Sequence, residues 1–274
     1  MKTINNYLHD IERYGFTPSK LYRRLFLSRQ DLPKILSISI PKSGTNLLQR
    51  ILTLHPLLYR RLLPTLGPRN RDVWSNLNDV FPKTKRGEIV SAHFDYDAEL
   101  ENYLLNDAGH KIIFTARDPR DIVISAMYYI LKRPDHAYHA KLKGLRNEKE
   151  MLTALIRGDD KIRPIDQQIH RFVGWINPRV LYVKFEELVG AAGGGNDVLQ
   201  RSTIQRIYTH LGMQLDDELL EFIASHCRSS KSQTFRRGMI RSWEIHFDSE
   251  LKRIFKEVAG DLLIQLGYEN GHDW

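Results

Sequence analysis

The chain has 274 residues, of which 42% are hydrophobic and 27% are charged, a balance typical of soluble globular proteins. The single cysteine, Cys227, excludes an internal disulfide, and no apolar segment reaches the roughly 18 residues of a membrane-spanning helix. The first 16 residues also lack the continuous apolar core of a signal peptide, so we expect a cytoplasmic protein without a membrane partner. The formal charge of +8 comes from scattered lysines and arginines, which favours a small polyanionic ligand over nucleic acid.

Short apolar segments alternate with helical patterns along the chain. Segments rich in valine and isoleucine predict buried strands at 34–40, 88–94, 111–117 and 179–185. Helical patterns lie at 43–55, 119–132, 165–176 and 200–212. This alternation predicts an α/β fold with a central parallel sheet flanked by helices, whose ligands bind beyond the carboxyl ends of the strands. We expect one domain over residues 1–274, within which the long polar segment 132–163 is a candidate lid or substrate-binding segment.

The turn after the first strand, PKSGTNLL (41–48), has the composition of a phosphate-binding loop. Gly44 permits a tight turn, and the amides from Ser43 to Leu47 are expected to point together at the start of a helix, where the helix dipole favours an anion. Lys42 adds a movable charge, and the hydroxyls of Ser43 and Thr45 add donors. The order differs from G-x-x-x-x-G-K-[ST], because here the lysine precedes the only glycine. A turn whose Ser and Thr only cap the helix is the alternative.

A second candidate anion site follows the third predicted strand, in IIFTARDPRDIVISAMYY (112–129). Asp118 suits the helix N-cap and Pro119 the first helical position. Ser125 lies about two turns into this helix, on the side that can face Arg117. A guanidinium and a hydroxyl that converge there would hold a phosphate with directional bonds. The alternative for Ser125 is a hydrogen bond to its own helix backbone.

Together, PKSGTNLL and ARDPRDIVISAMYY resemble the two nucleotide-binding signatures of the cytosolic-type sulfotransferases. That family transfers a sulfuryl group from 3′-phosphoadenosine 5′-phosphosulfate (PAPS), and its second signature places Arg and Ser eight positions apart, as Arg117 and Ser125 are. TFRRGMIRSWEIHF (234–247) resembles the C-terminal motif of the family, and VLYVKFEEL (180–188) resembles the strand before its last helices. The resemblance covers about residues 34–250 and implies the sulfotransferase fold, with a P-loop-like loop that binds the 5′-phosphosulfate.

The resemblance also implies the donor-binding residues. The 5′-phosphosulfate would be held by Lys42, Ser43, Gly44, Thr45, Asn46 and Leu47. The 3′-phosphate would be held by Arg117, Ser125, Arg236, Arg237 and Gly238. The product would be 3′-phosphoadenosine 5′-phosphate (PAP), and no metal is implied. Two positions depart from the family, because Leu47 replaces a tryptophan that stacks on adenine and Phe185 replaces a nucleotide-contacting tyrosine.

Two residues are assigned to catalysis by the resemblance. His93, at the end of the second predicted strand, would accept the acceptor's proton, and Lys42 would stabilise the leaving oxygen. The residues alone leave alternatives open, because His93, Asp95 and Asp97 alternate and would share one face of an extended chain. Three side chains on one face would suit a metal site. Alternatively, one of the two carboxylates would orient the imidazole. The two histidines of HAYHA (136–140) similarly suit a metal site or a solvated loop.

We therefore predict a PAPS-dependent sulfotransferase that acts on a small-molecule alcohol, phenol or amine, with no nucleic-acid partner. One alternative is a nucleotide-dependent kinase of P-loop-like fold, with Asp118 or Glu186 as the acidic metal ligand; another is a non-catalytic nucleotide-binding protein. Candidate residues for the wall of the acceptor pocket are Trp74, Phe94, Tyr128, Tyr129 and Tyr138.

Overall fold

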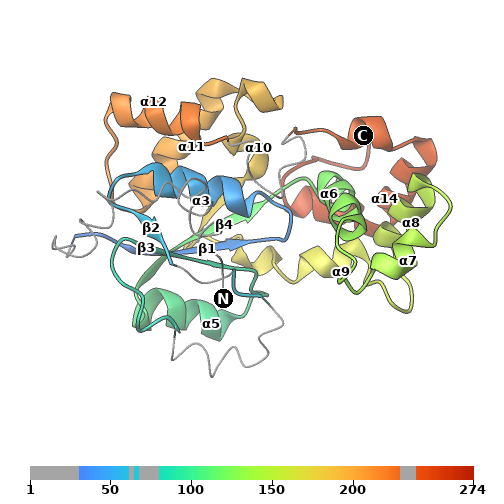
Figure 1. Ribbon diagram of the computed structural model, residues 1–274, viewed down its shortest axis with the longest axis horizontal. Coiled ribbons are helices and arrows are strands. Elements are labelled where there is room, and N and C mark those ends of the chain that lie inside the picture. Colours follow the sequence, from blue (N-terminus) through green and yellow to red (C-terminus); the bar gives the residue numbers. More distant parts are fainter. Residues whose placement is uncertain (1–30, 62–64, 68–79, 229–238) are drawn as a thin grey trace.

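A central parallel sheet organises the part of the chain that the computed structural model describes, residues 31–61, 65–67, 80–228 and 239–274 (Figure 1). Its five strands stand in the order β2-β3-β1-β4-β5. They are β1 (Lys34–Ser39), β2 (Tyr59–Arg60), β3 (Glu88–Ala92), β4 (His110–Ala116) and β5 (Leu181–Lys184). Every residue of β1 after Lys34 is buried, as expected for the middle strand of a sheet that is covered on both faces.

Helices cover the two faces of the sheet (Figure 1). Successive side chains of β1 point to opposite faces, so Ile35 belongs to one apolar cluster while Leu36 and Ile38 belong to another. The face of Ile35 is covered by α3 (Thr45–Leu54), α10 (Phe185–Leu188), α11 (Asp197–His210) and α12 (Asp217–His226). The other face is covered by α5 (Ala98–Asn102), which continues into a π-helical turn, Tyr103–Asp107.

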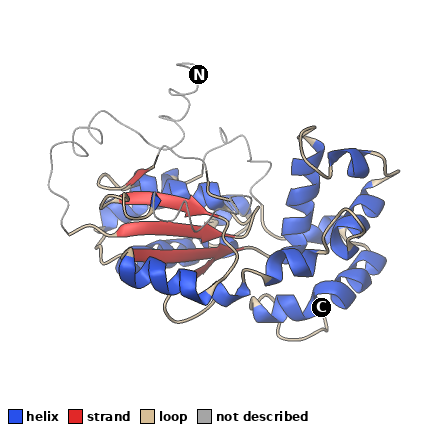
Figure 2. Ribbon diagram, turned by 90° about the horizontal axis from the view of Figure 1, so that it is seen from below, coloured by secondary structure: helices blue, strands red, loops and turns tan. Residues whose placement is uncertain are grey.

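A second group of helices lies beyond the carboxyl ends of the strands (Figure 2). It consists of α6 (Pro119–Leu131), α7 (His139–Lys143), α8 (Glu148–Arg157), α9 (Ile165–His170), α13 (Trp243–His246) and α14 (Ser249–Gln265). Helix α8 packs on α6, α9 and α14, and its buried Leu152 belongs to the same apolar cluster as Leu36 and Ile38 of the sheet. The helical group therefore shares its core with the sheet, and it forms one side of the space in which a ligand of the sheet would bind.

The predicted α/β fold with a central parallel sheet is confirmed, and the predicted strands agree with the structure to within two residues. One strand was missed, because β2 has only two residues and no apolar pattern of its own. The predicted helix 165–176 ends early, at His170, and a 3-10 turn (Val173–Trp175) follows it. Within the described ranges, no helix is long and apolar enough to cross a membrane.

Candidate functional site

The turn between β1 and α3 has an unusual backbone. Lys42 has φ 75° and Gly44 has φ 87°, so two residues of the turn are in the left-handed region. Gly44 is the N-cap of α3, and a Cβ added to it would lie 2.4 Å from Cδ2 of Phe185. A glycine is therefore required here for its conformation and for space, because Phe185 packs directly against the backbone of the turn.

The two hydroxyls of the turn do not cap the helix. α3 has no side-chain cap, and the hydroxyl of Thr45 shares a 2.7 Å hydrogen bond with that of Ser39. Oγ of Ser43 is buried and has no hydrogen-bond partner in the described part of the chain. The capping alternative is therefore wrong. A buried hydroxyl without a partner costs free energy, and a ligand oxygen at the turn would remove that cost.

Some backbone amides of the turn are already used. Ser43 N donates to the carbonyl of Ile40 at 3.1 Å, and Leu47 N donates to that of Gly44 at 2.8 Å. The expectation that all amides from Ser43 to Leu47 converge on a ligand is therefore too broad. Within the described residues, the amides of Gly44 and Thr45 have no protein acceptor, and they lie at the N-terminus of α3.

The ammonium of Lys42 lies over the ring of Tyr129, with Nζ 4.1 Å from the ring centroid. Burial lowers the pKa of Lys42 to about 8, and the nearby charge of Arg117 adds to this effect. At neutral pH the side chain is still mainly protonated. Lys42 and Arg117, from the ends of neighbouring strands, thus form a positively charged region beyond the sheet.

His93 follows β3 and is oriented by the neighbouring strand β1. Its Nδ1 lies 2.6 Å from the carbonyl oxygen of Ser39 and 3.3 Å from the Ser39 hydroxyl. A carbonyl oxygen only accepts, so Nδ1 carries the proton and Nε2 of the neutral ring is a base. Burial lowers the pKa of His93, and the charges of Arg171 and Lys42 lower it further against the opposing hydrogen bond to Ser39. The ring is therefore neutral at pH 7.

Neither aspartate of the HFDYD segment orients His93, so that alternative is wrong. Asp97 caps α5 by accepting from Leu100 N at 2.8 Å, and Asp95 pairs with Arg171 at 3.3 Å. In the part of the chain that the structure describes, no three His, Cys, Asp or Glu side chains are grouped as metal ligands would be.

Arg117 follows β4 directly and contacts three other segments. Its Nη2 donates to Asp121 at 3.0 Å and to the carbonyl of Met239 at 2.9 Å, and its guanidinium carbon lies 4.5 Å from the ring centroid of Phe185. Its Nε is buried and has no hydrogen-bond partner among the residues that the structure describes. Ser125 is half-buried two turns along α6. Arg236, Arg237 and Gly238 lie outside the described residues, but Met239, the next residue along the chain, contacts Arg117.

Side chains of the C-terminal segment support the turn that follows Arg117. Asp118 is the N-cap and Pro119 the first residue of α6, as predicted. The guanidinium of Arg120 lies against both Trp243 and Trp274, 4.0 and 4.4 Å from their ring centroids. Arg120 also pairs with Asp118 and Glu269, each at 2.7 Å. The sequence pattern did not identify these supporting residues, because they are separated from the turn by more than 100 positions.

Glu186, in the short helix α10 that follows β5, supports the same turn. It accepts from Asp118 N at 3.0 Å and from the hydroxyl of Tyr268 at 2.8 Å, and burial raises its pKa to about 7. Asp118 and Glu186, the two candidate metal ligands of a kinase, are thus both engaged within the protein. This arrangement disfavours the kinase alternative.

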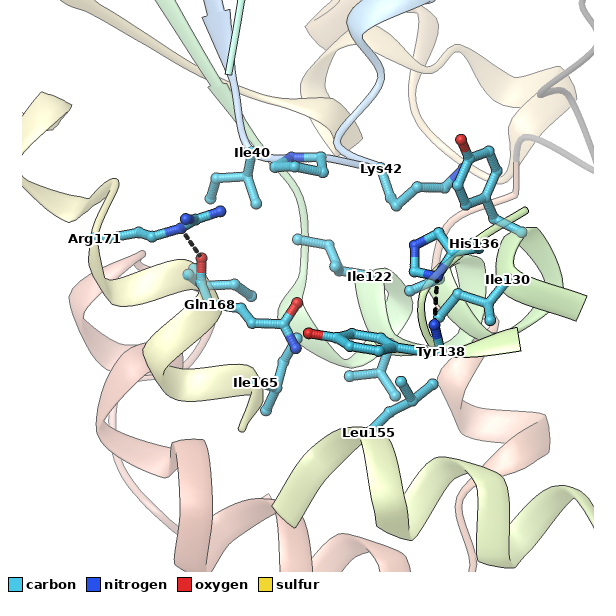
Figure 3. A pocket seen from close by; sticks show the side chains of 15 residues that line it. Ile40, Lys42, Ile122, Ile130, His136, Tyr138, Leu155, Ile165, Gln168 and Arg171 are labelled. Atoms are coloured by element: carbon cyan, nitrogen blue, oxygen red, sulfur yellow. Dashed lines mark hydrogen bonds between the residues drawn. The ribbon is translucent and has the colours of Figure 1, made fainter. Parts of the chain in front are cut away.

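A cavity of about 140 Å³ opens beside Lys42, between the β1–α3 turn and helices α6, α8 and α9 (Figure 3). Aliphatic side chains form most of its wall, with Ile122 and Ile165 among them. Of the aromatic residues proposed for the wall, Tyr129 and Tyr138 line this cavity. Phe94 and Tyr128 do not line it, because Phe94 packs in the core and Tyr128 donates to Glu148. Trp74 lies outside the described residues.

The segment 132–163 contributes to this cavity through His136, Tyr138 and Leu155. His136 accepts from Tyr138 N through Nδ1 at 3.1 Å, whereas His139 contacts the carbonyl of Ile130 at 2.9 Å. The two histidines of HAYHA therefore have separate structural partners. The segment remains a candidate substrate-binding segment.

The parallel sheet and the left-handed turn after β1 define an α/β fold whose candidate ligand site lies beyond the carboxyl ends of the strands. Residues 32–267 match the family model of the sulfotransferase domain, so the chain belongs to the sulfotransferase family, and the prediction of a sulfotransferase enzyme is confirmed.

Curated relatives and solved structures agree with this assignment. Mouse sulfotransferase 2B1 is 24% identical over 260 residues, which cover 82% of this chain and 69% of the relative. Human sulfotransferase 2A1 is 22% identical over 265 residues, or 83% and 85% of the two chains. The structure of mouse sulfotransferase SULT7A1 complexed with PAP superposes with a TM-score of 0.62 at 18% identity, over 90% of both chains. The structure of retinol dehydratase in a complex with retinol and PAP superposes with a TM-score of 0.53 at 17% identity, over 94% of this chain and 86% of the other chain.

Proposed function

We propose that the chain transfers a sulfuryl group from PAPS to a hydroxyl or amine of a small molecule by in-line displacement, and releases PAP. The observation that carries the proposal is a pair of buried donors that have no partner among the described residues, Oγ of Ser43 and Nε of Arg117, which follow the neighbouring strands β1 and β4. Two separated anion-binding positions suit a nucleotide with a phosphate at each end. The two solved neighbours, which carry PAP, support the same donor.

The proposed donor contacts divide into two groups. The 5′ group consists of Lys42, Ser43, Gly44, Thr45, Asn46 and Leu47, and the 3′ group of Arg117, Ser125, Arg236, Arg237 and Gly238. In the 5′ group, the amides of Gly44 and Thr45, the ammonium of Lys42 and the hydroxyl of Ser43 are the donors. Phe185 connects the groups, because its ring packs against both Gly44 and Arg117. None of these contacts involves a metal ion.

In the proposed mechanism the bound donor supplies an activated sulfuryl group, and the chain supplies a base and a cation. Nε2 of His93 accepts the proton of the acceptor, because Nδ1 is committed to the carbonyl of Ser39. Lys42 neutralises the negative charge that develops on the leaving oxygen. The cavity beside Lys42 holds the acceptor, and its aliphatic wall excludes water from the reacting groups.

A thermal-shift titration tests the donor. PAP, 5′-AMP and ATP are each added with Mg²⁺ or with EDTA, and ligand binding raises the melting temperature by mass action. We expect PAP to stabilise the protein most, equally in EDTA. A larger, Mg²⁺-dependent response to ATP would refute the proposal in favour of a kinase.

Two substitutions then test the division of the donor contacts. Arg117→Met removes a proposed 3′ contact, so the response to PAP should fall to that of AMP. Lys42→Met removes a proposed 5′ contact and should weaken both ligands. An equal effect of the two substitutions on AMP would contradict the assignment. Turnover of PAPS with a panel of phenols, alcohols and amines, measured as PAP release, separates an enzyme from a binding protein.

A further inference from the structure

The cavity beside Lys42 is lined by a second cation, and binding of the proposed donor does not explain why a cation lies there. Among the residues that the structure describes, fifteen side chains line the cavity, and none of these is a carboxylate (Figure 3). Two are strong cations, Lys42 and Arg171, and the figure shows Arg171 on a different side of the cavity from Lys42. Lys42 already has a proposed role at the leaving group of the donor. Arg171 has no such role, and the cavity wall around it is mostly aliphatic. A guanidinium in such a wall requires an anionic partner or water.

Arg171 is held in place by its own part of the chain. Its Nε donates to the carbonyl of Gln168 at 3.0 Å, and its guanidinium carbon lies 5.0 Å from the ring centroid of Phe172. Its carbonyl accepts from Tyr96 N at 2.7 Å, which fixes the backbone beneath the side chain. The guanidinium points inward toward Ile40 (Figure 3). Arg171 is therefore presented to the cavity by a rigid support and does not extend freely into solvent.

The acidic partner of Arg171 neutralises it only in part. Asp95 approaches Nε at 3.3 Å and Nη1 at 3.4 Å, both long for a charged pair, and its side chain is 48% exposed. A second cation, Arg163, is close enough to lower the pKa of Arg171, in addition to the larger effect of burial. Asp95 thus offsets the charge of Arg171 only in part, and Arg163 adds positive charge to the surroundings of Arg171, so this end of the cavity favours an anion.

We infer that the natural acceptor carries a carboxylate as well as the group that is sulfated, and that Arg171 binds this carboxylate. The inference rests on the proposed function and specifies its acceptor. A guanidinium binds a carboxylate through two parallel hydrogen bonds, and the ligand would replace Asp95 as the partner of Arg171. The aliphatic wall would hold the hydrocarbon body, and His93 would face the hydroxyl. Arg171 is then the residue that selects hydroxy acids over neutral alcohols and phenols.

The test uses two phenols of nearly the same shape, 4-hydroxyphenylacetate and its neutral amide, 4-hydroxyphenylacetamide, together with their 3-hydroxy isomers. Binding to the PAP complex is measured by calorimetry, and PAPS-dependent sulfation is measured as kcat/KM for each member of a pair. The readout is the acid-to-amide ratio. Because both probes use the same base, any effect of a substitution on the basicity of His93 cancels in this ratio.

We expect the acid to be preferred roughly ten- to hundredfold in at least one isomer pair, as for a charge-assisted pair. Arg171→Gln should bring the ratio close to one. Asp95→Asn should raise the ratio, because it removes the carboxylate that competes with the ligand. Opposite effects of these two substitutions would not follow from a general loss of structure.

An acid-to-amide ratio at or below one in every pair would overturn the inference. If the protein still binds PAP in that case, the proposed sulfotransferase function stands. The same conclusion would follow if the acid is preferred but Arg171→Gln leaves the ratio unchanged. No thermal response to PAP would instead refute the proposed function, and the inference with it.

Discussion

Gly44→Ala is the substitution with the most specific structural consequence. A methyl group at position 44 would lie 2.4 Å from Cδ2 and 3.0 Å from Cε2 of Phe185, at a backbone φ of +87°. The ring of Phe185 is also the surface on which Arg117 stacks. The substitution should therefore destabilise the protein and also displace Arg117, which belongs to the other proposed phosphate site.

The magnitude has two parts. Alanine in the left-handed region costs about 1–2 kcal/mol in the free energy of unfolding. The overlap with Phe185 forces the ring to move, which adds about 1–3 kcal/mol, as in other overpacked sites. The total of about 2–5 kcal/mol corresponds to a fall in melting temperature of roughly 5–15 °C for a chain of this size. The Kd for PAP should rise by about tenfold or more, because Arg117 loses its support.

Gly109→Ala is the matched control. Gly109 has φ +67°, but a Cβ there meets no atom within 4 Å, so only the backbone cost applies. Thermal unfolding and PAP titration are measured for both variants. Gly109→Ala should lose about 1–2 kcal/mol and retain the wild-type affinity for PAP. If the two variants are equally destabilised, or if Gly44→Ala binds PAP as the wild type does, the argument through Phe185 is wrong.

Three further predictions concern buried charges. The pKa of Lys42 is about 8, and a bound anionic ligand would raise this pKa. The affinity for PAP should therefore fall by up to about tenfold per pH unit above pH 8, and Lys42→Met should remove this pH dependence. Burial lowers the pKa of His110 from 6.5 to about 4, so as the pH falls the unfolded chain binds a proton at this histidine before the folded chain does. About 3 kcal/mol of the free energy of unfolding is therefore lost between pH 6.5 and 4. Denaturation of His110→Gln over the same pH range should show a smaller loss of stability. Trp274→Ala removes a ring stacked on Arg120 and should raise the Kd for PAP about threefold to tenfold, whereas Ile245→Ala, at an 82% exposed position, should leave it unchanged.

The sheet was predictable because its central strands are covered on both faces and therefore consist of nearly continuous apolar residues. This holds for β1, β3 and β4, whose buried side chains come from consecutive positions. The segment 132–163 was harder to interpret, because its charged residues suggested a loop. Yet Leu152, Leu155 and Ile156, the buried residues of α8, have helical spacing, and this signal could have predicted the helix.

The site was predictable where its residues are close together in the sequence. The Lys42–Gly44 turn and the Asp118 cap each depend on a few consecutive residues, and both are found. What orients His93 was not predictable, because Ser39 lies 54 residues away and is brought beside it only by the pairing of β1 with β3. Local acidic residues were the natural candidates for this role, but Asp97 is needed at the start of a helix.

Lys42 shows why the turn is suited to bind a polyanion. Its left-handed backbone carries an energetic cost for any residue with a side chain, and burial together with Arg117 disfavours its charge. Mobile surface lysines have neither property. A donor with one phosphate beside Lys42 and another beside Arg117 would stabilise both cations, and the cost of bringing the cations together has already been met by folding. The same positions would bind a neutral ligand poorly, so under the proposed function the turn would select for charge before any contact with the base of the proposed nucleotide.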